Sequence, residues 1–340
     1  MSDKKKAPKP KPDGTSKVAV RRSKLIYEAY MEEPDDRELL FQSSVMAHCY
    51  FPRREPDIAP DKVWVTESGK MNLYVMPMPV FDPITHDLRY LGLPYGAKAR
   101  IILATLNTIA LKTQNRTIEM PTDNLTDFTT FMGFSEGGSQ IATIRDQISR
   151  MASCVIRMTY DSAAGQENVN MPLVTGFTLF PDQHPGQLML WPSRIVLSEE
   201  YFHNLMDHAV PLAKSHLLAL SGNVTGLDIY TFLAHRLHRI PANKPQFLGW
   251  QTLYEQFGKD YGRIADFRIN FTRTLKLVKS LYTDARIEEK AGRGLMLHHS
   301  APPIPKKLII TGLTLDKREV DSKPEKYVDK SLKKRRLNEL

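Results

Sequence analysis

Cysteine is almost absent from this 340-residue sequence: only Cys49 and Cys154 occur, and neither belongs to a CxxC or a Cys/His ligand spacing. A disulfide scaffold and a structural zinc site therefore lack the residues that they need. Long apolar runs are also missing. None approaches the roughly 20 residues that cross a bilayer, and no apolar segment follows the Lys- and Pro-rich start. We therefore expect a cytoplasmic protein with no membrane partner.

Several sequence motifs of enzymes are missing as well. There is no GxxxxGK[ST] phosphate loop, no HExxH, and no pair of histidines flanking one apolar residue, which nicking initiators need. His235 and His238 lie three residues apart, but no third metal ligand is near them, so a partly buried or helix-capping role is favoured. We therefore expect no enzymatic activity, no catalytic residue, no metal and no cofactor.

Positive charge is concentrated at the two ends of the chain. The sequence holds 47 Lys and Arg against 38 Asp and Glu, a formal net charge of +9. Residues 1–24 carry nine basic and two acidic side chains, and residues 306–340 carry eleven and six. The remaining residues are slightly acidic. Basic ends on a near-neutral body are typical of attachment to polyanions, although they would also simply keep a protein in solution.

The pattern of apolar residues, prolines and glycines predicts five segments and an α+β, mainly helical fold. They are a disordered basic arm at 1–24, two short helices and a β-hairpin at 25–94, a first compact unit at 95–194, a second at 195–305, and a disordered basic tail at 306–340. The arm has three prolines and too little apolar surface to offset the entropy of ordering.

The two compact units share one order of predicted elements, which is the order of a winged helix. In the first unit, helices at 97–114, 124–132 and from Ser139 onward alternate with a short strand at 117–120 and a Gly-rich turn, and strands follow at 155–160, 174–180 and 188–191 around a polar loop at 161–170. In the second, helices at 224–239, 251–257 and 263–281 precede a hairpin whose basic, Gly-rich tip is 290–294. The sequence thus predicts tandem winged-helix domains.

The predicted helix at 263–281 has two distinct faces. At about 100° per residue, one stripe is apolar, with Ile264, Phe267, Phe271, Leu275 and Val278. Polar and basic residues lie off this stripe and at the hairpin tip. We single out Arg263, Arg268, Thr272, Arg273, Lys276, Lys279 and Arg293. In a helix-turn-helix the second helix lies in the major groove, where Arg and Lys meet phosphates and base edges. We therefore predict that these residues bind DNA. An ordinary solvated helix face is the alternative.

The corresponding helix of the first unit offers fewer cations. The only cations that lie off its isoleucine stripe are Arg145 and Arg150. We name both as candidate DNA-binding residues, and a dimerisation surface is an equal alternative for this helix.

Several stretches of the sequence resemble a known family. These are YLGLPYGAKARIILATLNTIALKTQNRTIEM, FMGFSEGGSQIATIRDQISRM, LWPSRIVLSEEYF, IYTFLAHRLHRI, GWQTLYEQFG and FRINFTRTLKLV, within residues 51–305. As a set they resemble the plasmid-encoded RepA family of replication initiators. The resemblance implies binding to repeated sites in double-stranded plasmid origin DNA, opening of a nearby A+T-rich region, and recruitment of host initiator and helicase proteins as partners.

The sequence therefore predicts a non-enzymatic, sequence-specific DNA-binding initiator of plasmid replication. Two alternatives remain open: a winged-helix transcriptional repressor, and a partition or structural protein that holds DNA through its basic ends. The sequence also leaves open whether the chain acts as a monomer or as a homodimer.

Overall fold

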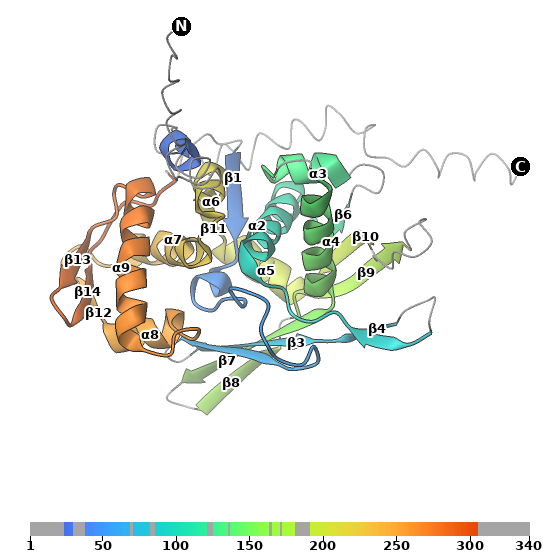
Figure 1. Cartoon of the computed structure of the whole chain (residues 1–340), viewed down its shortest axis with the longest axis horizontal. Helices are drawn as coiled ribbons and strands as arrows, with labels where there is room; N and C mark the ends of the chain where they lie inside the picture. Colours follow the sequence, from blue (N-terminus) through green and yellow to red (C-terminus); the bar gives the residue numbers. More distant parts are fainter. Residues whose placement is uncertain are drawn as a thin grey trace, which may run out of the picture.

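The computed structural model describes residues 24–29, 38–68, 71–81, 86–120, 125–134, 137–162, 165–170, 172–180 and 191–304. The predicted basic arm, apart from Lys24, and the predicted basic tail lie outside the described residues. The described part mixes helices with small antiparallel sheets (Figure 1), in agreement with the expected α+β composition. None of its described helices has the length and apolar character needed to span a membrane.

The N-terminal part is mainly extended. Residues 24–29 are helical, and the elements that follow are β1 (Leu39–Gln42), the 3-10 helix η2 (Ser44–Ala47), β2 (Trp64–Ser68), β3 (Met71–Pro77), β4 (Pro79–Phe81) and β5 (Leu88–Tyr90). The predicted hairpin is confirmed, because β2 and β3 pair with Trp64 opposite Val75.

The prediction of a second N-terminal helix is wrong. Residues 39–42 form strand β1, which pairs antiparallel with β11 (Val210–Ala213) near the centre of the molecule (Figure 1). All four residues of β1 are buried, so both faces of the strand are covered. A short apolar run buried on both faces has no alternation, and periodicity alone cannot distinguish it from a buried helix.

The middle of the chain carries three helices and two sheets. Its elements are α2 (Gly96–Thr113), β6 (Thr117–Glu119), α3 (Leu125–Phe131), α4 (Gly138–Ala152), β7 (Cys154–Ser162), β8 (Gly165–Asn170), β9 (Val174–Phe180) and β10 (Trp191–Leu197). One sheet has the order β6-β10-β9, and the other, β2-β3-β7-β8, joins this part to the N-terminal hairpin.

Three details of this region differ from the expectation. The helix expected from Ser139 onward is α4, which begins at Gly138, and the carbonyl of Gly137 accepts from the amides of Gln140 and Ile141. The predicted loop at 161–170 is largely a hairpin, because backbone pairing of β7 with β8 does not require apolar side chains. The boundary expected between residues 194 and 195 falls inside β10.

The C-terminal part holds most of the remaining helices. Its elements are α5 (Glu199–His208), β11, α6 (Lys214–Leu220), α7 (Val224–Arg236), the 3-10 helix η3 (Leu237–Arg239), β12 (Gln246–Gly249), α8 (Trp250–Phe257), α9 (Ile264–Leu281), β13 (Ile287–Lys290) and β14 (Gly294–Leu297). Ser198 caps α5, since its Oγ accepts from the amide of Tyr201 at 3.0 Å. Strands β12, β13 and β14 form a sheet of order β12-β14-β13.

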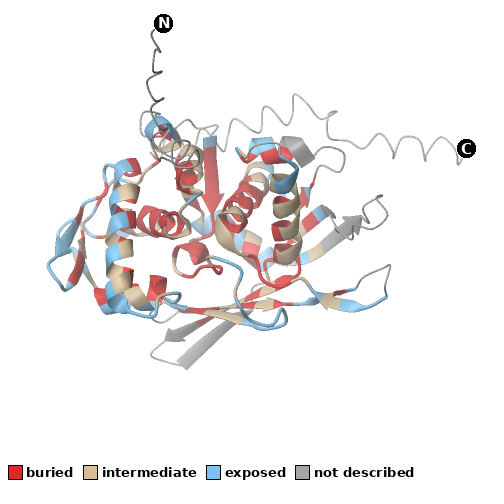
Figure 2. Cartoon of the chain, viewed as in Figure 1, coloured by how far each residue is buried: buried red, intermediate tan, exposed pale blue. Residues whose placement is uncertain are grey.

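Helix α2 connects two hydrophobic cores. Ile102, Leu103 and Leu106 pack in a core with α4, β6 and β10, whereas Ile101 and Ala104 pack in a second core with α7, α8 and α9. Residues 99–108 of this helix are all buried, so the helix is covered around its whole circumference there (Figure 2). The two helical groups therefore share one helix and pack as neighbours.

The imidazole of His216 is a buried titratable group next to this junction. Its Nδ1 lies 2.9 Å from the Tyr230 hydroxyl, and burial lowers its pKa from the ordinary value of 6.5 to about 4. The unfolded chain takes up this proton below about pH 6.5 and the folded chain only near pH 4. Lowering the pH from 6.5 to 4 should therefore lower the free energy of unfolding, and this group contributes about 1.4 kcal/mol per pH unit to that loss.

The variant His216→Gln should lose less stability between pH 6.5 and 4.5, because glutamine can accept a hydrogen bond from the Tyr230 hydroxyl and does not titrate. Urea unfolding of both proteins at several pH values measures the difference. Parallel curves for the two proteins would contradict the prediction.

Candidate nucleic-acid interface

Helix α9 follows α8 through a tight turn that requires glycine at residue 258. The amide of Gly258 donates to the carbonyl of Tyr254 at 2.6 Å, and a Cβ at Gly258 would lie 2.5 Å from that same oxygen. The amide of Tyr261 then donates to the carbonyl of Gly258 at 2.8 Å. Any side chain at residue 258 would therefore force the backbone of this turn to move.

One face of α9 packs on an aromatic cluster. Phe271 meets the ring of Trp250 at 6.0 Å and that of Phe257 at 5.4 Å, both edge to face, and Phe267 meets Tyr254 at 5.5 Å. Such pairs stabilise a core beyond the area that they bury. The predicted apolar stripe is confirmed except at Ile264, which is 36% exposed. As the first residue of α9, it precedes the turn that packs on the aromatic rings.

The opposite face of α9 carries the predicted basic residues. Arg273 and Lys276 are exposed, and Arg268 and Thr272 are half-buried. The Arg268 guanidinium lies 5.1 Å from the centroid of the Trp250 ring, so the end of the arginine side chain contacts α8. Figure 2 shows the exposed residues along α9. The face thus presents several cations from one rigid helix.

The three other predicted residues of this unit have local partners. Arg263 binds Asp266 through two hydrogen bonds of 2.8 and 2.9 Å, which lowers the pKa of that carboxyl. Lys279 donates to the carbonyl of Ile287 at 3.3 Å and so ties α9 to β13. Arg293 is exposed at the tip of the β13–β14 hairpin and lies 5.8 Å from the centroid of the Phe247 ring.

The cations of the first unit are placed differently. Arg150 forms ion pairs with Asp146 at 2.9 Å and Glu55 at 2.8 Å, and its guanidinium lies 5.2 Å from the centroid of the Tyr95 ring. Its side chain is only 15% exposed. Arg145 is half-buried, and no residue from 140 to 152 is exposed. Helix α4 therefore lacks the open basic face that α9 has.

Two cations that sequence reasoning did not single out hold the α8–α9 turn against the N-terminal part. Arg53 donates to the carbonyl of Phe257 and lies 3.8 Å from Asp260. Lys259 donates to the carbonyl of Val65 in β2, with its Nζ 4.1 Å from the centroid of the Trp64 ring. The position of α9 thus depends on contacts made by residues about 200 positions earlier.

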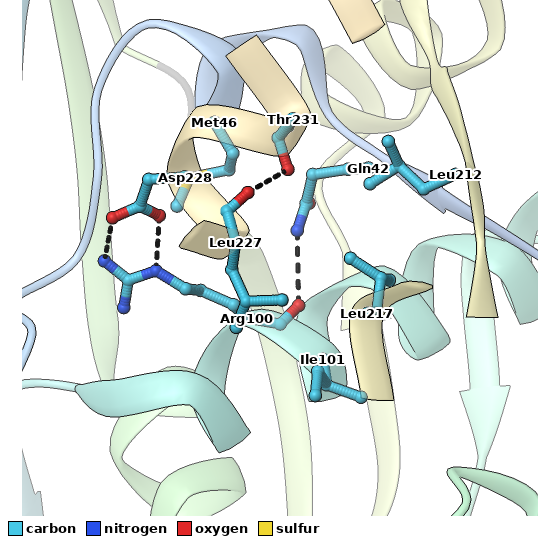
Figure 3. A pocket seen from close by; sticks show the side chains of 9 residues that line it. All are labelled: Gln42, Met46, Arg100, Ile101, Leu212, Leu217, Leu227, Asp228 and Thr231. Carbon is cyan, nitrogen blue, oxygen red and sulfur yellow. Dashed lines mark hydrogen bonds and ion pairs between the residues drawn. The ribbon is translucent and has the colours of Figure 1, made fainter. Parts of the chain in front are cut away.

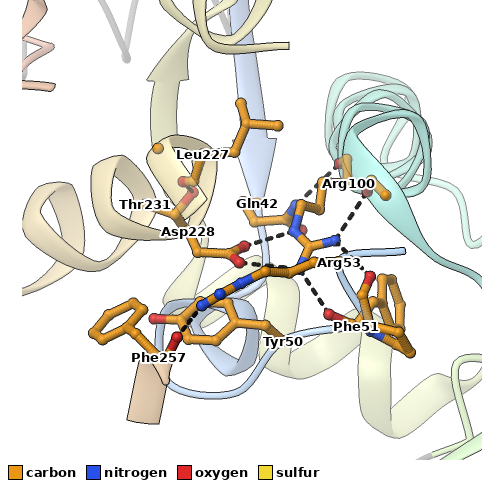
Figure 4. A network of polar contacts seen from close by, with 12 residues as sticks. Gln42, Tyr50, Phe51, Arg53, Arg100, Leu227, Asp228, Thr231 and Phe257 are labelled. Atoms are coloured by element: carbon orange, nitrogen blue, oxygen red, sulfur yellow. Dashed lines mark hydrogen bonds and ion pairs between the residues drawn. The ribbon is translucent and has the colours of Figure 1, made fainter. Parts of the chain in front are cut away.

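A buried ion pair joins α2 to α7 (Figure 4). Nε and Nη2 of Arg100 donate to the two carboxylate oxygens of Asp228 at 2.6 and 3.0 Å, and both side chains are at most 5% exposed. The guanidinium also donates to the carbonyls of Phe51, Pro52 and Gly96. Burial raises the pKa of the Asp228 carboxyl, and the charge of Arg100 opposes that shift.

A small cavity lies beside this pair, between α2, α7 and β11 (Figure 3). Its volume of about 10 Å³ suits one water molecule, and its walls include Gln42, Leu212 and Thr231. The Gln42 amide donates to the carbonyl of Arg100 at 3.2 Å on one side of it. The cavity is too small for a cofactor, so the network serves to join the two helical groups.

One family model matches the middle of the chain. Residues 93–252 match the family model described as plasmid encoded RepA protein. The match starts just before α2 and ends within α8, so the residues of α9 lie beyond it. A comparison with curated proteins finds no match.

Solved structures with similarity to the chain include two of RctB. One is the crystal structure of SeMet derivatives of domain 2 and domain 3 of RctB, which is 12% identical, has a TM-score of 0.49, and covers 77% of this chain and 97% of that chain. The other, of RctB domains 2-3, is 11% identical, has a TM-score of 0.44, and covers 80% and 99%.

The sequence resemblance is thus confirmed over a shorter span than residues 51–305. The family match begins at LPYG, includes the Gly-Gly turn and ends at GWQ, which are three of the motifs on which the resemblance was based. Residues 93–252 of this chain are therefore similar to plasmid-encoded RepA proteins.

Proposed function

We propose that the chain is a sequence-specific DNA-binding initiator of plasmid replication, and that α9 is the helix that enters the major groove. The observation that carries this proposal is the exposed basic face of α9, backed by an aromatic core and placed next to a hairpin with an exposed arginine at its tip. A helix in the major groove needs such a face for phosphates and base edges.

The order of the elements supports two winged-helix units. In the second unit, α7, β12, α8 and α9 are followed by the β13–β14 hairpin, and the sheet order β12-β14-β13 places the last strand between the other two. In the first unit, α2, β6, α3 and α4 precede β9 and β10, and the sheet order β6-β10-β9 is the same. The β7–β8 hairpin is an insertion between α4 and β9.

We propose different roles for the two units. The closed ion pairs of Arg150 leave α4 less suited to a groove than α9. Unit 2 therefore supplies the main base contacts, and unit 1 supplies backbone contacts to DNA or a surface for a second copy. The similarity of residues 93–252 to plasmid-encoded RepA proteins supports origin opening and recruitment of host initiator and helicase proteins as the steps that follow binding.

No enzymatic step is part of this proposal. The pentapeptide GFSEG, residues 133–137, matches the GxSxG pattern, which in α/β-hydrolases joins a strand to a helix. Here it lies between the helices α3 and α4. That context does not support a nucleophilic serine.

Footprinting on the DNA that flanks the gene tests the proposed function. We expect several protected sites of one sequence at a regular spacing, because an initiator binds repeated sites at its origin. A single palindromic site would instead support the transcriptional repressor. Protection without any sequence preference would support the structural or partition protein.

A further inference from the structure

An exposed isoleucine stands in the middle of the basic face of α9. Ile269 is 62% exposed, whereas Phe267, Phe271, Val278 and Leu281 of the same helix are buried. Isolated exposed aliphatic residues are common on protein surfaces, so exposure alone assigns no role. Its position among the cations of this helix is what distinguishes Ile269.

The helical period places Ile269 between the cations. At about 100° per residue, Arg268 lies about 100° to one side of Ile269 and Arg273 about 40° to the other, with Lys276 about 20° away. Ile269 is the sixth residue of α9, within its N-terminal half. The N-terminal residues of a helix in the major groove are the ones that contact base edges. A helix whose flanking cations bind DNA would therefore direct Ile269 at the floor of the groove.

We infer that Ile269 contacts the 5-methyl group of a thymine in the DNA site. The inference rests on the proposed function of α9. An aliphatic side chain offers no hydrogen bond, and the thymine methyl is the apolar group that the major groove displays. A protein partner is less suited to this face, because one isoleucine among cations is far smaller than the apolar area of a stable protein interface.

Removing that methyl group from the DNA is the sharpest test. The full chain first selects its preferred duplex from a randomised library, and each thymine of that duplex is then replaced singly by deoxyuridine, which differs only by the methyl. For the unmodified protein we expect one position at which the replacement weakens binding by about fourfold, the value for one buried methyl. For Ile269→Ala, the same replacement should change affinity by less than about 1.5-fold.

Ile264→Ala is the matched control. Ile264 is also an exposed isoleucine of α9, but it points about 140° away from Ile269, so its loss should leave the deoxyuridine effect intact. Both variants should keep the melting temperature of the unmodified protein, because neither removes a buried side chain.

The outcomes separate the inference from the proposed function. Selection of one duplex sequence, followed by deoxyuridine effects that are identical in Ile269→Ala and the unmodified protein, would overturn the thymine contact and leave the function of α9 in place. Full DNA affinity of Ile269→Ala on every duplex would do the same and favour a protein partner. Failure of the library to yield any preferred sequence would overturn the proposed function as well.

Discussion

Replacing Asp228 by alanine should lower the free energy of unfolding by about 3–5 kcal/mol, because the guanidinium of Arg100 would then be buried without its counter-charge. The side chain of Arg100 is 5% exposed, and its remaining partners are neutral backbone carbonyls of residues 51, 52 and 96. Those carbonyls cannot replace a carboxylate bound through both oxygens. Urea unfolding at pH 7 measures the loss.

The double variant Arg100→Met with Asp228→Leu is the control that identifies the cause. Removing both charges together leaves an apolar pair of similar volume, so the double variant should be more stable than either single variant. A second control is Asp266→Ala, which breaks the exposed pair with Arg263 and should change stability little. If Asp228→Ala cost no more than Asp266→Ala, the buried pair would not be what holds α2 against α7.

The sequence predicted the positions of α9 and of the hairpin after it well, because these elements follow from local patterns. The α9 helix was expected at 263–281 and spans Ile264–Leu281, and the hairpin tip was expected at 290–294, between β13 and β14. An apolar stripe at helical spacing and a glycine at each turn fix these elements without reference to the rest of the chain.

Local sequence patterns do not predict contacts between segments that are far apart in the chain. Arg150 was proposed for DNA, but Glu55, which lies 95 residues earlier, forms an ion pair with it. Nothing in the local sequence of either segment indicates that they meet. The contacts of Arg53 and Lys259 that hold the α8–α9 turn against the N-terminal part likewise follow from tertiary packing and not from local sequence.

One tertiary contact did leave a trace in the sequence. Arg100 is the only charged residue between positions 99 and 111 of α2, and Asp228 is the only one between positions 224 and 234 of α7. Buried charges are almost always paired, so two lone opposite charges in two buried helices predict each other. These two charges therefore predict that α2 packs against α7.

The two faces of α9 should respond differently to substitution. Phe271→Ala should lower the free energy of unfolding by about 3–5 kcal/mol, since Phe271 is 2% exposed and its ring meets three other aromatic rings. Arg273→Ala and Lys276→Ala remove exposed side chains, so they should keep the melting temperature and weaken DNA binding. A lost base contact costs about 1–3 kcal/mol and relaxes specificity at one position, whereas a lost phosphate contact weakens all sequences alike and makes the salt dependence shallower.

Arg273 and Lys276 are the appropriate choices because the other cations of α9 also serve the fold. Arg268 lies over Trp250 and Lys279 bonds the carbonyl of Ile287, so their loss would mix stability with binding. Melting temperature and affinity for matched and mismatched duplexes must be measured on the same samples. If both variants keep their fold, their affinities and their salt dependence, α9 does not bind DNA. The first unit, through Arg145 and Arg150, would then be the better candidate.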